Sequence, residues 1–202
     1  MIIKNARIFD GRKFLPEDVV LVKKGIIHGV CNGVPAKKRV KVIDAKRMIL
    51  SPGLIDIHTH GAGGVNTMEI KNAGELVKIS RANVKQGVTN IFLSCFYSGV
   101  ARKSMEIIAK NSENLPGASV EGIYLEGPFI NPKKRGMIPE GYIISAKKEA
   151  DEFLRFAADK KNRIKICCVA PENPFFPAVV KTLKERGVIF GLGHSCLLYT
   201  SD

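Results

Sequence analysis

Hydrophobic residues along the chain follow two patterns, which change near residue 50. Before that point, short apolar runs at 2–8, 19–22, 25–30 and 40–43 are separated by turn residues such as Asp10-Gly11 and Lys24-Gly25. Short apolar runs bounded by such pairs are typical of β-strands joined by tight turns. Residues 1–50 are therefore predicted to form a small all-β segment.

After this segment the chain alternates between apolar strands and amphipathic helices. Gly87 and Gly187 stand where two of these helices are expected to end. Alternating β and α units with almost continuously apolar strands indicate a parallel sheet covered by helices. The predicted strands are 48–57, 88–95, 120–125, 164–169 and 188–192, and the predicted helices are 73–86, 100–111, 146–159 and 176–186.

Polar residues with metal-binding chemistry stand at the ends of three predicted strands. His58 and His60 are two residues apart, so an extended strand directs both imidazoles to the same face. A lone His-x-His pair also arises by chance on surface strands. Glu126 and His194 follow two further strands, and this set of nitrogen and carboxylate donors suits zinc, iron or another first-row divalent ion.

The periodicity alone is equally compatible with an open doubly wound sheet and with a barrel. The candidate ligands favour the barrel, because they follow the first, third and fifth predicted strands. In a barrel the carboxyl ends of all strands surround one opening, whereas an open sheet spreads them along a crevice. A complete (β/α)8 barrel needs roughly 250 residues, so we expect the 202 residues to form an incomplete one.

The composition raises one further class of function, because the formal net charge is +13. Clustered basic residues would indicate binding to nucleic acid. Here they are dispersed, with short clusters only at 36–39 and 133–135, so a solvated surface is the preferred interpretation and no nucleic-acid partner is expected. A cationic surface would also suit an anionic sugar phosphate, but charge alone does not decide this.

The five cysteines lack the spacing of a metal knuckle or a disulfide framework. Cys167 and Cys168 lie in an apolar run and are predicted to be buried, reduced thiols. Neither a secretory signal nor an apolar run of about 20 residues is found. We therefore expect no membrane association and a cytoplasmic location.

Three motifs in this order resemble the N-acetylglucosamine-6-phosphate deacetylase family of the amidohydrolase superfamily. They are SPGLIDIHTHG at 51–61, LEGPFINPKK at 125–134 and GHS at 193–195. The first is shared across the superfamily, whereas the second is much more specific. The resemblance implies that residues 1–50 form part of a β-sandwich and that residues 51–195 form the N-terminal part of a metal-dependent hydrolase barrel.

The resemblance also implies roles for individual residues. Glu126 and His194 are expected to bind a tightly held metal, and His58 and His60 to bind a second metal bridged by Glu126. Met137 and Ile138 are expected to contact the sugar, although family members often have a histidine at the position of Ile138. Lys133, Lys134 and Arg135 could attract a phosphate, but a solvated loop is favoured.

The implied reaction is hydrolysis of an N-acetylated amino-sugar phosphate by a water activated by one or two divalent ions, zinc or iron. The general acid of the family is an aspartate on a later strand, and no aspartate here fits its motif. The full-length protein is expected to be a homo-oligomer, and the 202 residues alone to be inactive. Asp56 lies on the same face of the predicted strand as His58 and His60 and could support the site. A structural role at the end of the strand is expected at least as strongly.

Residues 196–202, CLLYTSD, depart from the family pattern. They equal the translation of a transposase end sequence used in library preparation. We therefore expect a non-native read-through tail on a truncated gene, with a genuine loop as the alternative.

Two other functions compete with the deacetylase interpretation. A cyclic amidase similar to dihydroorotase or hydantoinase shares the His-x-His motif, but such enzymes typically bridge their metals with a carboxylated lysine, which LEGPF argues against. A noncatalytic basic binding fragment would need aromatic residues among clustered cations, whereas the chain has four Tyr, no Trp and dispersed charge.

Overall fold

The structure is a computed structural model that describes residues 1–35 and 40–197. It divides into two compact units, Met1–Gly53 and Leu54–Asp202, which we describe separately. Residues 198–202, most of the predicted read-through tail, lie outside the described residues, as does the basic cluster at 36–39.

The first unit is all-β, as predicted. Its main sheet has the order β4-β3-β1-β5, and a second ladder pairs β2 with β6. Ala6, Ile8, Val20 and Ala45 form its small buried cluster. The strands are β1 (Ile2–Lys4), β2 (Arg7–Ile8), β3 (Val19–Lys23), β4 (Ile26–Cys31), β5 (Val42–Asp44) and β6 (Ile49–Leu50).

Two strands predicted as continuous are interrupted. The run 2–8 divides into β1 and β2 at Asn5, whose φ of 55° is left-handed. The run 48–57 divides into β6, which pairs with β2, and β7 (Leu54–Thr59), which belongs to the second unit. Pro52 and Gly53 separate them, because proline lacks a backbone donor and glycine weakens a strand.

The second unit contains a five-stranded parallel sheet with the order β13-β12-β11-β10-β7. Each strand lies beside the strand that precedes it in sequence, without the reversal that defines an open doubly wound sheet. The prediction of an incomplete TIM-like barrel is therefore confirmed. The remaining strands are β10 (Val88–Cys95), β11 (Ser119–Glu126), β12 (Ile164–Val169) and β13 (Ile189–Leu192).

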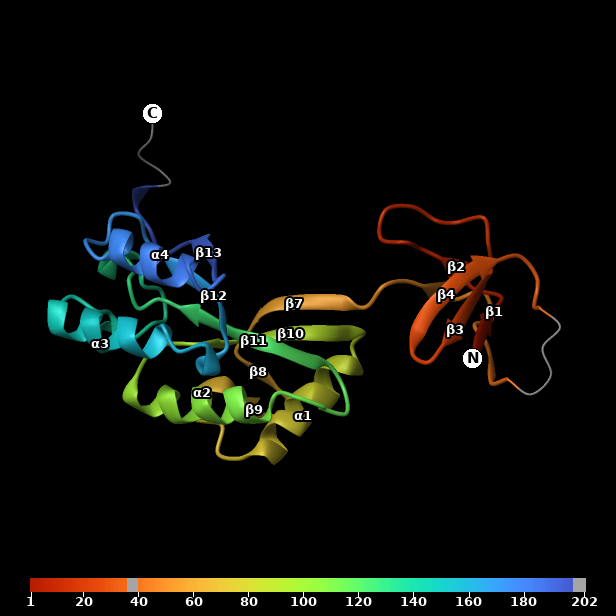
Figure 1. The fold of residues 1–202 in the computed structure, drawn as a ribbon, viewed down its shortest axis with the longest axis horizontal. Helices are drawn as coiled ribbons and strands as arrows, with labels where there is room; N and C mark the ends of the chain where they lie inside the picture. The colour runs from red at the N-terminus through yellow and green to blue at the C-terminus, as the bar shows by residue number, and fades with distance from the viewer. Residues whose placement is uncertain (36–39, 198–202) are drawn as a thin grey trace. The chain divides into compact units, whose positions relative to one another are not determined.

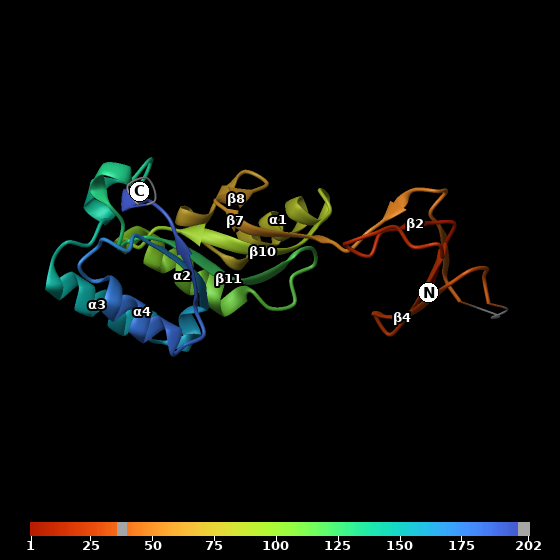
Figure 2. The ribbon, with the colours of Figure 1, turned by 90° about the horizontal axis from the view of Figure 1, so that it is seen from above.

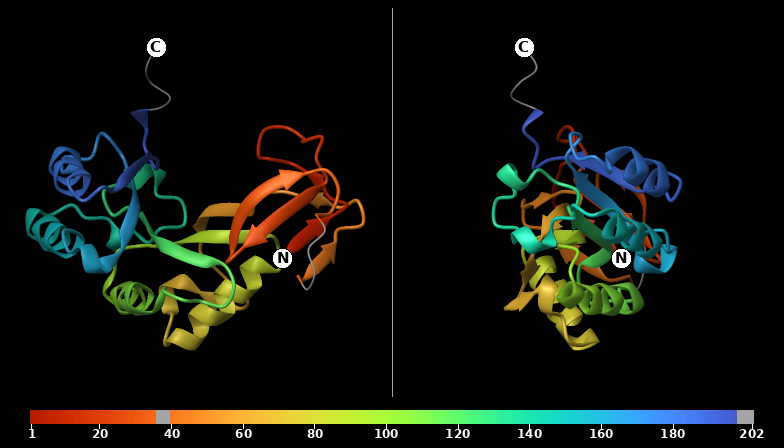
Figure 3. Two further views of the ribbon diagram at one scale, coloured as in Figure 1. Left: turned by 45° about the vertical axis from the view of Figure 1, so that its right-hand side comes forward. Right: turned by 90° about the vertical axis from the view of Figure 1, so that its left-hand side faces the viewer.

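Four helices follow one another around one face of this sheet (Figures 1 and 2). They form an arc outside the strands in the right-hand view of Figure 3. The helices are α1 (Ala73–Val84), α2 (Gly99–Asn111), α3 (Lys147–Ala157) and α4 (Phe176–Lys184). Short connecting elements are β8 (Gly61–Ala62), β9 (Val65–Asn66), η1 (Thr67–Glu69), η2 (Pro132–Lys134), η3 (Glu140–Tyr142) and η4 (Lys160–Asn162).

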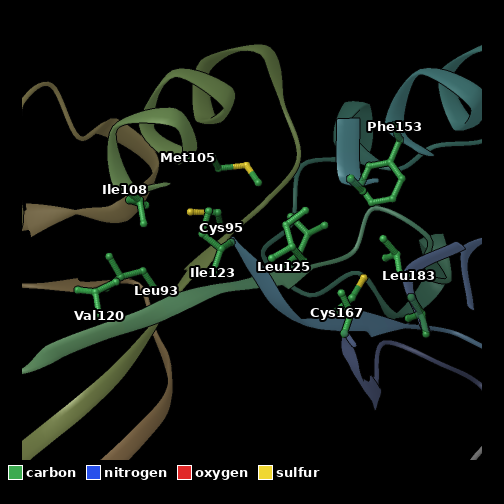
Figure 4. Packing of buried hydrophobic residues seen from close by; sticks show 14 of the residues in the cluster. Leu93, Cys95, Met105, Ile108, Val120, Ile123, Leu125, Phe153, Cys167 and Leu183 are labelled. Carbon is green, nitrogen blue, oxygen red and sulfur yellow. The ribbon is translucent and has the colours of Figure 1, made fainter. Parts of the chain in front are cut away.

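A single hydrophobic core joins these helices to the outer face of the sheet. Met105 and Ile108 of α2 lie near Leu93 and Ile123, while Phe153 of α3 lies near Leu125 (Figure 4). All of these side chains are fully buried. The carboxyl ends of the five strands, where the candidate ligands stand, are thereby attached to a close-packed scaffold.

The cysteine prediction is confirmed within this core. Cys95, Cys167 and Cys168 are buried free thiols. Burial raises the pKa of Cys95 to about 12 and raises the pKa of Cys167 as well. These thiols remain protonated and behave as small hydrophobic groups. Among the described helices, none has the length and apolar character that crossing a membrane requires.

Candidate metal centre

The two histidines of the first motif converge at the end of β7. Their Nε2 atoms are 3.2 Å apart, and the two rings meet at an interplanar angle of 75°. Both are accessible, with side-chain exposures of 37% for His58 and 45% for His60. The Asp56 carboxylate accepts a hydrogen bond of 3.0 Å from the His58 backbone amide, so the structure shows a local backbone contact for Asp56.

A tight β8–β9 hairpin begins directly after His60. Gly61 has a φ of 127°, and a Cβ at this position would overlap the Val65 carbonyl oxygen. Gly63 and Gly64 also have positive φ and form the turn of the hairpin. The glycines therefore let the chain reverse immediately beside the histidine pair.

Glu126 stands at the end of β11 and faces all three candidate histidines. Its Oε1 lies 2.9 Å from His194 Nε2, while its Oε2 lies 3.2 Å from His60 Nε2 and 3.6 Å from His58 Nε2. Despite these short distances, Oε2 is buried and accepts no hydrogen bond of acceptable geometry. The ligand atoms of His58, His60 and Glu126 lie within 4.8 Å of one another.

His194 follows β13 and has one available ring nitrogen. Its Nδ1 lies 2.8 Å from the Lys134 carbonyl oxygen, and a carbonyl only accepts, so Nδ1 carries the proton and donates it. In the neutral imidazole, Nε2 then presents its lone pair to Glu126. This is the arrangement of metal-binding histidines, whose second nitrogen donates to a backbone carbonyl.

These observations together fit a divalent cation. Glu126 Oε2, which has no hydrogen bond, lies beside the Nε2 atoms of His58 and His60, and Oε1 lies beside Nε2 of His194. The space between the His58 and His60 nitrogens holds at most one proton. Nitrogen and oxygen donors of this kind bind first-row divalent ions. The structure thus brings together His58, His60, Glu126 and His194, the four residues that the sequence analysis selected as ligands.

Tyr124 and Cys168 lie next to this cluster. The Tyr124 ring packs edge-on against His58 with 4.6 Å between ring centroids. Desolvation raises the pKa of both the phenol and the Cys168 thiol, and the nearby Glu126 carboxylate adds to both shifts. Both groups therefore remain neutral and contribute no competing charge beside the histidines.

Glu172 is a polar residue beside the site that the sequence analysis did not select. It follows β12 and accepts hydrogen bonds from the Asn131 side chain, the Ser195 hydroxyl and the Cys196 backbone amide. The strand-end rule that selected Glu126 and His194 would also have found it, because Glu172 stands three residues after β12 ends.

The two residues predicted to contact the sugar differ in accessibility. Met137 is 93% exposed, whereas Ile138 is only 2% exposed. The Ile138 carbonyl accepts a hydrogen bond of 2.9 Å from the Arg135 guanidinium, so Arg135 braces this loop. The roles of Met137 and Ile138 in substrate binding remain predictions.

Comparison with known proteins gives curated relatives that are named as deacetylases of N-acetylated amino-sugar phosphates. An N-acetylglucosamine-6-phosphate deacetylase from Homo sapiens is 33% identical over 95% of this chain and 48% of its own length. One from Bacillus subtilis is 28% identical over 96% of the chain and 50% of its own length. The crystal structure of the Pasteurella multocida deacetylase matches with a TM-score of 0.83 and 24% identity, over 96% of this chain and 50% of that one.

The chain is a relative of the N-acetylglucosamine-6-phosphate deacetylases and has the amidohydrolase fold. No protein-family model matches it. It spans about half the length of the curated relatives that it matches. The relatives cover the β segment and the incomplete barrel together, because the matches include about 95% of the chain.

Proposed function

We propose that this chain is part of a metal-dependent deacetylase that hydrolyses N-acetylglucosamine 6-phosphate to glucosamine 6-phosphate and acetate. The observation that supports this best is the position of Glu126. It is the second residue of the LEGPFINPKK motif, ends β11, and places both carboxylate oxygens within 3.6 Å of histidine nitrogens. The relatives named as deacetylases of this substrate are similar to this chain over about 95% of its length.

Glu126 and His194 would hold one divalent ion, zinc or iron, and His58, His60 and Glu126 would hold a second. The chemistry that such an ion supplies is acidification of a water molecule, whose pKa falls to about 7. The Lys134 carbonyl fixes the tautomer that His194 needs for this role. Glu126 supplies the negative charge that three neutral imidazoles lack.

Cleavage of the amide also requires a general acid to protonate the departing amine. The family resemblance assigns this acid to an aspartate on a strand that follows residue 202. We therefore propose that the 202 residues do not turn over substrate alone, that residues 196–202 are not native, and that the full-length protein acts as a cytoplasmic homo-oligomer. The Lys133–Arg135 cluster is a candidate contact for the substrate phosphate.

The test uses the protein expressed from the complete reading frame of its source locus, which we call the full-length protein. It is incubated with N-acetylglucosamine 6-phosphate, and acetate release is followed with zinc or iron(II) present. Rapid release that a chelator abolishes is expected. Dihydroorotate, hydantoin and N-acetylgalactosamine 6-phosphate serve as comparison substrates, the last because one relative is named as a deacetylase of that sugar.

Two results would contradict the proposal. Faster ring opening of dihydroorotate or hydantoin would favour the cyclic amidase alternative. Turnover that persists after complete removal of metal would exclude the metal-dependent mechanism. Sequencing the locus beyond the codon for Ser195 provides an independent control, because the proposal expects the frame to continue into a helix, a further histidine and a strand-end aspartate.

A further inference from the structure

Glu172 occupies a central place among the loops that follow the strands. It lies in the loop after β12, and β12 is the strand between β11 and β13. Its Oε1 accepts hydrogen bonds of 2.9 Å from the Asn131 side chain, in the loop after β11, and 2.7 Å from the Cys196 amide, after β13. Its Oε2 accepts a hydrogen bond of 2.7 Å from the Ser195 hydroxyl. One carboxylate therefore joins three neighbouring loops.

The loop after β13 needs such a restraint because of the backbone at His194. This residue has a φ of 52°, in the left-handed region that non-glycine residues rarely adopt. The unusual backbone directs the imidazole toward Glu126 on one side and the Lys134 carbonyl on the other. Such a conformation persists only where surrounding contacts fix it.

The contacts around His194 all depend on the loops that Glu172 joins. The backbone amide of Asn131 donates a 2.9 Å hydrogen bond to the His194 carbonyl, so the loop after β11 holds the backbone of His194 directly. Ser195, the next residue, is 6% exposed and is held by Glu172, and its hydroxyl accepts a hydrogen bond of 3.0 Å from the Leu197 amide. Glu172 thus restrains His194 through the following residue, Ser195, and through Asn131.

We infer that Glu172 is a positioning residue that holds His194 in its metal-binding conformation by joining the loops after β11, β12 and β13. This inference rests on the proposed metal site, to which Glu172 itself donates no ligand atom. A carboxylate suits the role because it only accepts hydrogen bonds, and all three groups that face it are donors. The donor at position 196 is a backbone amide, which any residue except proline supplies, so the inference does not require Cys196 to be native. Although desolvation opposes it, hydrogen bonds from Cys196, Ser195 and Asn131 lower the pKa of Glu172 to about 2, so the group stays ionised.

The test compares Co2+ binding by the full-length protein and its variants. The visible absorption bands of bound Co2+ report ligand geometry, and a titration gives the affinity. Glu172→Ala is expected to weaken binding by about 10-fold, the lower end of the cost of losing an outer-sphere partner, because Glu172 acts on His194 through Asn131 and Ser195, and to alter the bands. Glu172→Gln retains one acceptor oxygen and is expected to recover part of the affinity.

The matched control is Glu75→Ala, because Glu75 also accepts a short hydrogen bond, 2.7 Å from the Lys71 amide, but lies in α1. Its Co2+ affinity is expected to stay within about twofold of the unmodified protein. If Glu172→Ala does not fold, Ser195→Ala decides, since it keeps Glu172 but removes the 2.7 Å bond to Oε2, together with the bond that the hydroxyl accepts from the Leu197 amide, and should still weaken binding severalfold.

Wild-type affinity and unchanged bands in Glu172→Ala, or in Ser195→Ala where the first variant is unfolded, would overturn the inference and leave the proposed function intact. If the unmodified full-length protein binds no Co2+ and shows no zinc- or iron-dependent turnover, the proposed function fails, and the inference fails with it. Equal losses in Glu172→Ala and Glu75→Ala would also overturn the inference, because a general loss of stability would then explain both.

Discussion

The two sides of the metal cluster differ in how firmly the fold holds them. His58 and His60 stand at the end of β7, which pairs with one strand among the described residues, and in this part of the barrel their side chains are 37% and 45% exposed. Glu126 and His194 come from β11 and the loop after β13, and their side chains are 12% and 21% exposed. His194 is fixed by the Lys134 carbonyl, whereas the His58 and His60 rings, within the described part of the chain, form a hydrogen bond with each other.

This difference indicates an order of metal affinity. Ligands fixed by outer hydrogen bonds lose less conformational freedom when they bind, which raises affinity. We therefore expect the first metal to bind at Glu126 and His194, and a weaker second metal to bind at His58 and His60. The following predictions test this comparison.

The largest effect is expected for Glu126→Gln, because Glu126 contacts both sides of the cluster. An amide loses the negative charge that balances the metal, so metal content and turnover of the full-length protein should both fall by more than the ~10–100-fold cost of an outer-sphere change. Metal analysis and acetate release measure these quantities. Glu121→Gln is the control, since Glu121 lies on the same strand and accepts a hydrogen bond from Asn90. Unchanged turnover with full metal content would remove Glu126 as a ligand.

The next effect separates the two sides of the cluster. In the full-length protein, His194→Asn should lower the affinity for the first zinc by more than about 10-fold. His58→Asn and His60→Asn should leave that affinity unchanged and reduce the stoichiometry from two to one. Metal titration followed by elemental analysis distinguishes the two results. His28→Asn, in β4 of the first unit, is the control histidine. The comparison would be reversed if His58→Asn removed the tighter metal.

A third prediction compares the strands that support the two sides. Ile123 of β11 is 0% exposed, whereas Ile55 of β7 is 63% exposed. Ile123→Ala should lower the free energy of unfolding of the 202-residue chain by about 2–5 kcal/mol, and Ile55→Ala by about 0.5 kcal/mol or less. Urea denaturation gives both values. Equal losses would mean that β7 is as well packed as the centre of the sheet.

The sequence predicted the central strands better than the edge. The bounds of β10 and β12 agree with the predicted 88–95 and 164–169, because apolar residues make up most of each strand. The predicted strand 48–57 was wrong in extent, since its apolar residues belong to two sheets in two units separated by Pro52 and Gly53. Periodicity does not reveal which partner strand an apolar run pairs with.

The candidate ligands were predictable because each ends or follows a strand, and parallel strands bring such ends together. The role inferred for Glu172 was not, because its partners Asn131 and Ser195 are 41 and 23 residues away in sequence. The left-handed backbone of His194 was also unpredictable, since tertiary hydrogen bonds impose it on a residue that does not prefer it.

The smallest effect concerns acid. Hydrogen bonding lowers the folded-state pKa of Glu172 from the ordinary 4.5 to about 2 despite desolvation, so the unfolded chain takes up this proton first. The stabilisation by Glu172 is therefore complete above pH 4.5 and is lost as the pH falls toward 2. We expect Glu172→Ala to show a shallower loss of unfolding free energy across that range, measured by urea denaturation at each pH. Glu75→Ala should keep the unmodified slope. If the unfolding free energy of Glu172→Ala depends on pH as steeply as that of the unmodified protein, the loops after β11 and β13 are held without the Glu172 carboxylate. The two sides of the cluster would then differ less in rigidity than their hydrogen bonds indicate.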